Sequence, residues 1–279
     1  MSEKTHIAII GPGVMGRTLT SSLIQTGGFL PEALTIAGPT ASRVEALCSE
    51  FGVRGTTSNT EAAASAEIVI LAIKPQRLDQ AAKALKGTIQ SQALVLSVMA
   101  GVSMEALQQT LGAKRVIRSM PNTPAQIGMG ITVWAQTAEV DEAQHALARR
   151  IFQTLGQEIF VEDENYLDMA TALSGTGPAY AFLFMEAMIE AGVHMGFPRR
   201  MAEQLVVQTL KGSVLFYENN HEHPARLRDD VTSPGGTSAE ALYYLEKAGF
   251  RTAISRAVWA AYQRSKELGQ GRARQDPEK

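Results

Sequence analysis

The stretch HIAIIGPGVMG, residues 6–16, decides the fold of this chain, because a short apolar run leads directly into a glycine-rich turn. The turn has the spacing G-x-G-x-x-G and opens a helical stretch that stops at the Gly27–Gly28 pair. After a strand and before a helix, this spacing is typical of dinucleotide binding. Gly11 permits the tight turn, Gly13 lets a pyrophosphate approach the backbone, and Gly16 lets helix and strand pack closely.

Further apolar runs of strand length follow, with helical segments between several of them. They lie at residues 34–38, 68–73, 94–100, 115–120, 130–135 and 158–161. Strands buried on both faces are continuously apolar, so the pattern predicts an α/β fold with a mostly parallel, doubly wound sheet. From about residue 166 the apolar spacing becomes helical and no convincing strand appears. We expect a Rossmann domain at 1–163 and an all-helical domain at 164–279.

Composition indicates an ordinary globular protein. Of 279 residues, 45% are hydrophobic and 19% are charged, which suits a chain with a sizeable core. The net charge of −2 provides no field that would attract nucleic acid or an anionic membrane. The single cysteine, Cys48, excludes a disulfide framework, favours a reducing compartment and fits simple packing within a helix.

No targeting or membrane segment is expected. Residues 1–10 lack the pattern of a signal peptide with a cleavage site. The most apolar helical segment, 179–192, is interrupted by Glu186 and Glu190 and is too short to span a bilayer, so we expect a buried helix there. The expected location is cytoplasmic, with a loose charged tail at 270–279.

The choice of cofactor is commonly determined at the end of the second strand, where an acidic side chain binds the ribose of NAD. Residues 37–40 read Ala-Gly-Pro-Thr, and no carboxylate appears until Glu45. Thr40, Ser42 and Arg43 could surround a 2′-phosphate, which favours NADPH and leaves NADH as the alternative cofactor. The alternative interpretation is that these three residues merely begin the next helix.

Two further loops fall where a cofactor crevice should lie, beyond the carboxyl ends of strands. One is Lys74-Pro75-Gln76, and the other is the segment 121–124, in which two prolines bracket Asn122 and a threonine. A stiff loop of this kind could hold a nicotinamide ring or a substrate edge, although ordinary turn chemistry would also explain it. In the segment 174–180, Pro178 follows two glycines and predicts another helix start with free amides.

The segment DDVTSPGGTSAEALYYLE, residues 229–246, predicts a helix start far from the glycine loop. Thr237 and Glu240 have the spacing of a capping box. Gly235 and Gly236 leave the backbone bare where unpaired amides and the positive end of the helix dipole point outward. This arrangement suits a small anion, although an ordinary turn before an ordinary helix is equally compatible with the stretch alone.

Several other chemistries lack their motifs. No Ser-His-Asp or Cys-His arrangement and no zinc spacing can be argued, so we expect no metal, and His221 and His223 fit a solvated turn. The helical half also lacks the Lys-x-x-x-Asn helix of β-hydroxyacid dehydrogenases. Hydride chemistry would therefore proceed without a dedicated charged acid or base.

Five segments resemble, in chain order, the motifs of pyrroline-5-carboxylate reductases. They are GPGVMG, AIKPQ, MPNTPAQIGMG, ALSGTGPAYAFLFMEAMIEAGVHMGFPR and DDVTSPGGTSAEALYYLEKAGFR, and the resemblance runs from about residue 5 to 268. It implies NAD(P)H-dependent reduction of L-1-pyrroline-5-carboxylate to L-proline by a Rossmann domain and helices that form an interlaced dimer. Two departures stand out. Ser238 replaces the family's usual threonine, and residues 38–40 replace a turn that is often Asn-Arg.

The motifs and the resemblance together predict a set of site residues. For substrate and catalysis they are Gly235, Gly236, Thr237 and Ser238, with Glu164 and Asp230 by analogy to the family. For the cofactor they are Gly11, Gly13, Val14, Met15, Gly16, Thr40, Ser42, Arg43, Asn59, Ala72, Lys74, Pro75 and Asn122. Two other functions stay open at this point: a related reductase of imines or ketones, including six-membered cyclic imines, and a non-catalytic NADPH-binding regulatory protein.

Overall fold

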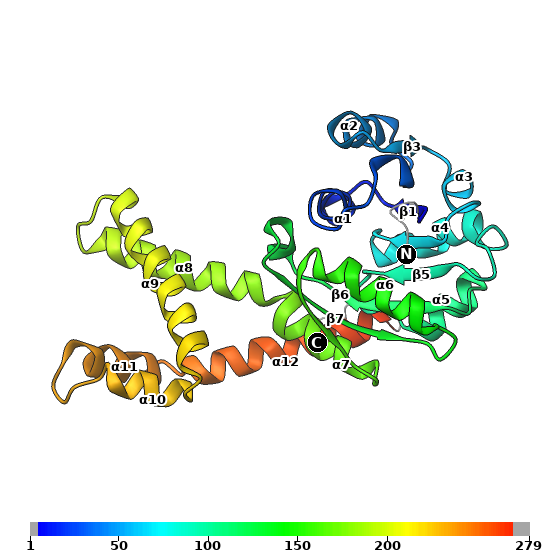
Figure 1. Ribbon diagram of the computed structural model, residues 1–279. Coiled ribbons are helices and arrows are strands. Elements are labelled where there is room, and N and C mark those ends of the chain that lie inside the picture. Colours follow the sequence, from blue (N-terminus) through cyan, green and yellow to red (C-terminus); the bar gives the residue numbers. More distant parts are fainter. Residues whose placement is uncertain (1–4, 270–279) are drawn as a thin grey trace, which may run out of the picture. The chain divides into compact units, whose positions relative to one another are not determined.

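A computed structural model describes residues 5–269 of the chain (Figure 1). It forms two compact units, one built from the described parts of Met1–Thr176 and Ala261–Lys279 and the other from Gly177–Ala260. The first is an α/β unit and the second is entirely helical. The tail at 270–279, which we expect to be loose, lies outside the described residues.

The α/β unit contains one eight-stranded sheet. Its strands are β1 (Ile7–Ile10), β2 (Leu34–Ala37), β3 (Arg54–Thr56), β4 (Ile68–Leu71), β5 (Leu94–Ser97), β6 (Val116–Met120), β7 (Gly130–Gln136) and β8 (Gly156–Phe160). Their order is β3-β2-β1-β4-β5-β6-β7-β8, and every neighbouring pair is parallel except β6 and β7. This confirms the mostly parallel, doubly wound sheet. The sequence pattern missed β3, because Arg-Gly-Thr is a short strand at the edge with no apolar run.

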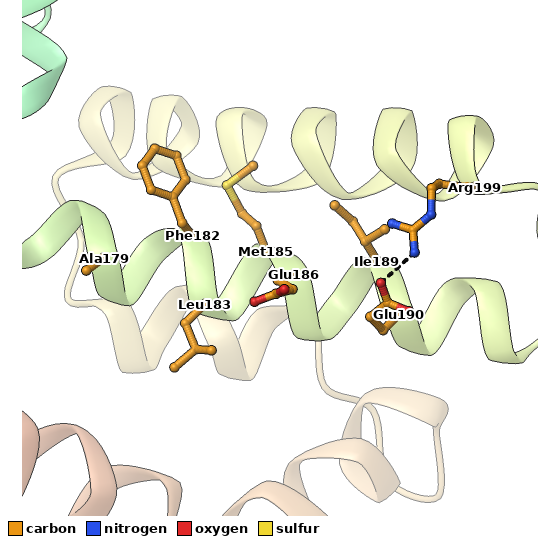
Figure 2. Close-up of a pocket in the computed structure, with 8 residues that line it drawn as sticks. All are labelled: Ala179, Phe182, Leu183, Met185, Glu186, Ile189, Glu190 and Arg199. Carbon is orange, nitrogen blue, oxygen red and sulfur yellow. Dashed lines mark hydrogen bonds and ion pairs between the residues drawn. The ribbon is translucent and has the colours of Figure 1, made fainter.

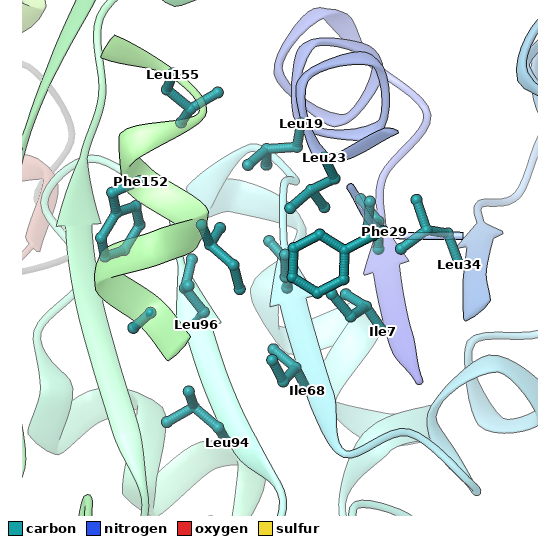
Figure 3. Close-up of a cluster of buried hydrophobic side chains, with 14 of the residues drawn as sticks. Ile7, Leu19, Leu23, Phe29, Leu34, Ile68, Leu94, Leu96, Phe152 and Leu155 are labelled. Carbon is teal, nitrogen blue, oxygen red and sulfur yellow. The ribbon is translucent and has the colours of Figure 1, made fainter. Parts of the chain in front are cut away.

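Helices cover both faces of the sheet. They are α1 (Val14–Gln25), α2 (Ala41–Phe51), α3 (Asn59–Ala63), α4 (Leu78–Leu85), α5 (Met104–Leu111) and α6 (Glu142–Gln153). Side chains of α1, α2 and α6 pack on one face, where Figure 3 shows Leu19, Leu23 and Phe152 over the strands. Side chains of α3, α4 and α5 pack on the other. The central strands β1, β2, β4 and β5 are buried on both faces, which is why they are almost continuously apolar.

Strand periodicity divides the residues of β1 between these two layers. Ile9 belongs to the layer under α1, and the neighbouring Ile10 belongs to the layer under α4. In register, Ile9 lies beside Ile36 of β2 and Ile70 of β4. Burying one such side chain stabilises the fold by roughly 1.5–3 kcal/mol, so the central strands anchor the loops that follow them.

A second group of elements completes the α/β unit. Helix α7 (Asn165–Ala170) continues through the π-helical turn η4 (Thr171–Gly175), and the last residues of α12 (Phe250–Gly269) also pack here. Gly101 has a positive φ of 75° and lies so close to this helix end that an added Cβ would meet the Gly269 nitrogen at 2.9 Å. The end of α12 therefore packs directly against the backbone of Gly101.

The helical unit holds α8 (Gly177–His194), α9 (Arg199–Asn220), α10 (Pro224–Asp230), α11 (Thr237–Lys247) and the first part of α12. Helices α8 and α9 pack closely, because Gly192 leaves room for Ala202 at a virtual Cβ distance of 3.0 Å. The expected helix start at Pro178 is only partly correct. Helix α8 begins at Gly177, but η4 leads directly into it, and the Thr176 amide is bonded to the Thr171 carbonyl at 2.8 Å.

The expectation that residues 179–192 form a buried helix is wrong for the single chain. Phe182 and Leu183 are 63% and 66% exposed, and Gly192 is the buried residue of the helix. Figure 2 shows Phe182, Leu183 and Met185 along an open groove of about 520 Å³, with the ion pair between Glu190 and Arg199 at 2.6 Å. Apolarity of this helix therefore marks a surface that the chain does not cover by itself.

Candidate active site

The glycine loop after β1 has the geometry that its spacing predicts. Gly11 has a φ of 118°, and its amide donates to the Ala37 carbonyl at 2.8 Å. A Cβ on Gly16 would lie 2.0 Å from the Gly11 carbonyl oxygen, so helix α1 touches the loop backbone. Gly13 is the N-cap of α1, and a Cβ there would meet nothing within 4 Å. The loop thus presents open space and helix N-terminal amides at Gly13, an arrangement that suits a phosphate.

A cleft of about 610 Å³ lies over the carboxyl ends of β1, β2 and β4. It is lined by the loops that follow β1 to β4 and by the start of α4. The polar lining residues are Thr40, Arg43, Thr57, Ser58, Asn59, Thr60, Lys74, Arg77 and Gln80. Three of these side chains are cationic and none is acidic. The cleft therefore complements a polyanion.

Seven of the predicted cofactor residues line this cleft. They are Gly11, Gly13, Thr40, Arg43, Asn59, Ala72 and Lys74. Thr40 is the N-cap of α2, yet its side chain makes no capping hydrogen bond within the described structure. The alternative that Thr40 merely begins this helix is thus weakened, because its hydroxyl is not used by the helix.

Other predicted cofactor residues do not line the cleft, namely Val14, Met15, Gly16, Ser42, Pro75 and Asn122. Met15 packs against the core, and Gly16 acts through close packing. The Asn122 side-chain oxygen accepts the Ile131 amide at 3.0 Å, which fixes the start of β7. The loop around Asn122 continues as the 3₁₀ helix η3 (Thr123–Ile127).

Sequence reasoning missed Arg77 and Gln80, and of the polar run at 57–60 it named only Asn59. The run follows β3, which showed no strand signal, so no sheet edge was expected there. Arg77 lies one residue beyond the Lys74-Pro75-Gln76 loop, in the 3₁₀ helix η2 (Pro75–Arg77). A basic residue so close to that loop was the available signal.

The second predicted site lies in the helical unit, at the start of α11. Gly235 has a φ of 72°, and Gly236 is the N-cap of the helix. The capping box expected from Thr237 and Glu240 is wrong, because Thr237 is already the first helical residue and the Glu240 amide bonds the Gly236 carbonyl at 3.2 Å. A Cβ on Gly236 would approach the Ser233 hydroxyl to 2.5 Å and the Ser233 carbonyl oxygen to 3.1 Å, so packing favours glycine there.

The amides at this helix start are not all free. The Gly236 amide donates to the Ser233 carbonyl at 3.0 Å. The first backbone bond of α11 is made by the Glu240 amide, so the three preceding amides, at 237–239, have no backbone partner within the described residues. Ser238 is half-buried and Thr237 is exposed. The donors that could meet an anion therefore begin one residue later than the sequence suggested.

The two acidic residues carried over by analogy both have partners. Asp230, at the end of α10, pairs with Arg226 at 3.3 Å on an exposed face. Glu164 accepts the Met104 amide at 2.7 Å and Arg118 at 3.0 Å. Arg118 also binds Asp168 at 3.0 Å, so Glu164 belongs to a buried network of the α/β unit.

Three side chains of the other candidate groups have structural roles. His221 ends α9 in a left-handed conformation, and His223 caps α10 by accepting the Ala225 amide at 3.2 Å. Burial, aided by the charge of Glu45, raises the pKa of the Cys48 thiol, which fits a packing role. From residue 5 to 269, no group of three His, Cys, Asp or Glu side chains is placed to hold a metal ion. Over the same range, no helix has the length and apolarity of a membrane span.

Similarity to known proteins agrees with the resemblance seen in the sequence. A pyrroline-5-carboxylate reductase from Synechocystis is 42% identical over 264 residues, covering 95% of this chain and 98% of the relative. The chain belongs to the pyrroline-5-carboxylate reductase family. The family predicted from the five motifs is thus confirmed, and so is an oxidoreductase that uses a nicotinamide cofactor.

Family assignments divide this reductase chain into two regions. Residues 164–268 match the family described as pyrroline-5-carboxylate reductase dimerisation. Residues 6–101, which include the glycine loop, match the family described as NADP oxidoreductase, coenzyme F420-dependent. The helical region is therefore of a type that assembles into homo-oligomers.

Solved structures of family members share the fold over nearly the whole chain. A pyrroline-5-carboxylate reductase from Coxiella burnetii has a TM-score of 0.85 at 34% identity, covering 95% of this chain and 98% of its own. The Plasmodium falciparum pyrroline carboxylate reductase, solved with NADP bound, has a TM-score of 0.89 at 31% identity, covering 96% and 100%. A dinucleotide site is thus present in a close structural relative.

Proposed function

We propose that this chain reduces L-1-pyrroline-5-carboxylate to L-proline with NADPH, which is the last step of proline synthesis. One observation carries the proposal, namely 42% identity to a reductase of that name over 95% of the chain. The cleft over β1, β2 and β4 supports it, because it combines an open glycine loop with cationic side chains.

The residues around the cleft fit a dinucleotide. The bare backbone at Gly13 and the amides that begin α1 would hold the pyrophosphate, and no described atom lies within 4 Å of a Cβ placed on Gly13. Thr40 and Arg43 would bind the 2′-phosphate at the end of β2, in place of the family's usual Asn-Arg turn. Lys74 and Asn59 supply further polar contacts along the same cleft. When bound, the reduced cofactor supplies the hydride.

The start of α11 supports binding of the substrate carboxylate. We assign that role to the amides at 237–239 and to the Ser238 hydroxyl, with Gly235 and Gly236 shaping the turn. The helix dipole contributes roughly 0.3–1 kcal/mol at an exposed site and up to about 2 kcal/mol at a partly buried one. Each charge-assisted hydrogen bond adds about 1.5–3 kcal/mol. An anchored carboxylate orients the C=N bond, which is the main contribution of the protein to the reaction.

The proton at the imine nitrogen has two sources in this proposal. The substrate arrives as the iminium, or the Ser238 hydroxyl donates at nitrogen. Asp230 and Glu164 stay secondary candidates near the substrate, Glu164 with one oxygen already bonded to Arg118 and the Met104 amide. Comparing the pH profile of kcat with and without the Ser238 hydroxyl distinguishes the two sources, because only loss of a donor shifts the profile.

Assembly and location complete the proposal. We place the domain boundary between residues 163 and 164, and the dimerisation match that begins at residue 164 supports this placement. We infer that the basic assembly is a dimer formed by the C-terminal helices, with a second copy of this chain covering Phe182 and Leu183. The single cysteine and the near-neutral charge support a cytoplasmic enzyme that binds neither nucleic acid nor membrane.

The direct test is oxidation of NADPH by the purified chain with pyrroline-5-carboxylate as substrate. We expect turnover with this five-membered imine and much less with a six-membered cyclic imino acid. The loss of absorbance of the reduced nicotinamide measures the rate of each reaction. Preference for the six-membered ring would assign the chain to a related imine reductase. Cofactor binding without any turnover would indicate a regulatory protein and would refute the proposal.

A further inference from the structure

We propose that Arg77 is a second specificity determinant for NADPH, binding the 2′-phosphate together with Arg43. This inference rests on the proposed function, since it concerns the cofactor that the cleft would hold. Arg43 lies on α2, after β2, and Arg77 lies on η2, after β4, while the strand between them, β1, carries the glycine loop. Both arginines line the same cleft of about 610 Å³. They reach it from elements on either side of that loop.

The charge balance of the cleft calls for a ligand with more than a pyrophosphate. Its lining contains Arg43, Lys74 and Arg77 and no acidic side chain. A pyrophosphate is already served by bare backbone at Gly13 and by the amides that begin α1. Cationic side chains beyond those amides match the additional phosphate that distinguishes NADPH from NADH. The chemistry of the lining therefore favours a ligand with a third phosphoryl group.

The hydrogen bonding of Arg77 leaves its charge available. Its Nη1 donates to the Gln80 side-chain oxygen at 2.9 Å, which is a neutral partner that also lines the cleft. Some other surface arginines of the same unit pair with carboxylates, as Arg149 does with Glu158 at 2.7 Å. Within residues 5–269, neither Arg43 nor Arg77 forms such an ion pair. A guanidinium has five donors in a planar fork that matches phosphate, and most of the donors of Arg77 are free for one.

The position of Arg77 also explains how this chain manages without the family's Asn-Arg turn. Residues 38–40 are Gly-Pro-Thr, and they supply one hydroxyl and no charge. Arg43 is then the only cation contributed from the β2 side of the described cleft. An arginine from the β4 side adds a second positive charge to the one that Arg43 supplies. Selection of NADPH would thereby depend on two walls of the cleft.

The test compares ligands that differ only in the 2′-phosphate. Calorimetry measures the affinities of the wild-type chain and of the Arg77→Gln variant for four ligands. These are NADPH, NADH and the fragments 2′,5′-ADP and 5′-AMP. We expect the substitution to lower the affinity for NADPH and for 2′,5′-ADP by about ten- to a hundredfold, which corresponds to the loss of one charge-assisted hydrogen bond. NADH and 5′-AMP should change by less than about twofold, because neither carries the group that Arg77 binds. Arg77→Lys should recover part of the lost affinity, since lysine restores the positive charge but not the planar set of donors of a guanidinium.

Arg54→Gln is the matched control, because Arg54 is an exposed arginine of the same unit that does not line the cleft. It should leave all four affinities within about twofold. Equal weakening of NADPH and NADH by Arg77→Gln would overturn the inference and place Arg77 at the pyrophosphate or adenine instead. Unchanged affinities would overturn it as well. If wild-type chain reduces pyrroline-5-carboxylate in either case, only the role of Arg77 is refuted, whereas absence of turnover in wild type refutes the proposed function itself.

Discussion

At the scale of single residues, Arg118 makes the most consequential contacts of the α/β unit. Its guanidinium is 3% exposed and bridges Glu164 and Asp168 at 3.0 Å each. Asp168 in turn accepts the Ser265 hydroxyl at 2.6 Å, so one arginine links β6, α7 and the end of α12. No hydrophobic pattern signals this network, because its members are separated by up to 147 positions in the sequence, from Arg118 to Ser265.

Replacing Arg118 should therefore destabilise the fold strongly. We expect Arg118→Met to lower the free energy of unfolding by about 3–5 kcal/mol, since it leaves two carboxylates partly buried without their cation. Denaturant unfolding followed by circular dichroism measures the change. Arg17→Met is the control, because Arg17 and its partner Glu50 are 55% and 41% exposed, and exposed pairs contribute at most about 1 kcal/mol. Equal losses in the two variants would contradict the structural role of Arg118.

In the proposed mechanism, Ser238 binds the substrate carboxylate directly. We expect Ser238→Ala to raise KM for pyrroline-5-carboxylate about tenfold or more and to lower kcat modestly, because a hydrogen bond to the carboxylate is lost. Ser238→Thr, the residue usual in the family, should retain activity. Ser213→Ala serves as control, since that hydroxyl bonds the Thr209 carbonyl within α9. Steady-state kinetics that do not change in Ser238→Ala would remove this side chain from the mechanism.

At the scale of elements, the turn between β1 and α1 separates two uses of glycine. A methyl group at Gly16 would meet the Gly11 carbonyl oxygen at 2.0 Å, whereas one at Gly13 would meet no atom of residues 5–269 within 4 Å. Gly16→Ala should thus lower the melting temperature by several degrees through overpacking. Gly13→Ala should leave the melting temperature of the free protein nearly unchanged. It should nevertheless weaken the binding of NADPH, because the methyl group would occupy the space proposed for the pyrophosphate. A thermal scan with and without NADPH separates the two effects, and identical behaviour would argue against this assignment.

Strand and helix content followed largely from local pattern, and the errors have local causes. Continuous apolar runs marked seven of the strands, because both faces of the sheet are buried. The three-residue edge strand β3 has no such run and was missed. At α11 the sequence placed the cap at Thr237 instead of Gly236, because a favourable hydroxyl outweighed a glycine whose need arises from contact with Ser233.

At the scale of the whole molecule, the helical unit leaves large apolar side chains exposed in the single chain. Leu183 is 66% exposed and Phe182 is 63% exposed on α8, and Trp259 is 61% exposed on α12. Soluble monomers rarely leave so much apolar surface uncovered, and such surface commonly marks an interface. The match to a dimerisation family over 164–268 gives the same indication for this region.

Leu183→Glu should therefore dissociate the assembly. We expect the variant to sediment as a monomer at micromolar concentration, because a buried unpaired carboxylate at an interface is strongly unfavourable. Its helix content should persist, since the Leu183 side chain is largely exposed in the chain alone. Ile159→Glu is the control, as Ile159 is 48% exposed on β8 in the α/β unit. Retention of the wild-type sedimentation coefficient by Leu183→Glu would show that α8 does not form the interface.

The sequence by itself determined the α/β sheet, the glycine loop, the family and seven of the residues that line the cleft, because these depend on short-range patterns and on residues that directly follow strands. Only the tertiary structure decided that Arg77 joins Arg43 in one cleft, that Glu164 is bonded to Arg118, and that the free amides begin at Thr237. The physical reason is the same in each case. Such contacts join residues whose proximity depends on the order in which strands are laid into the sheet and on backbone hydrogen bonds, neither of which local sequence spacing specifies.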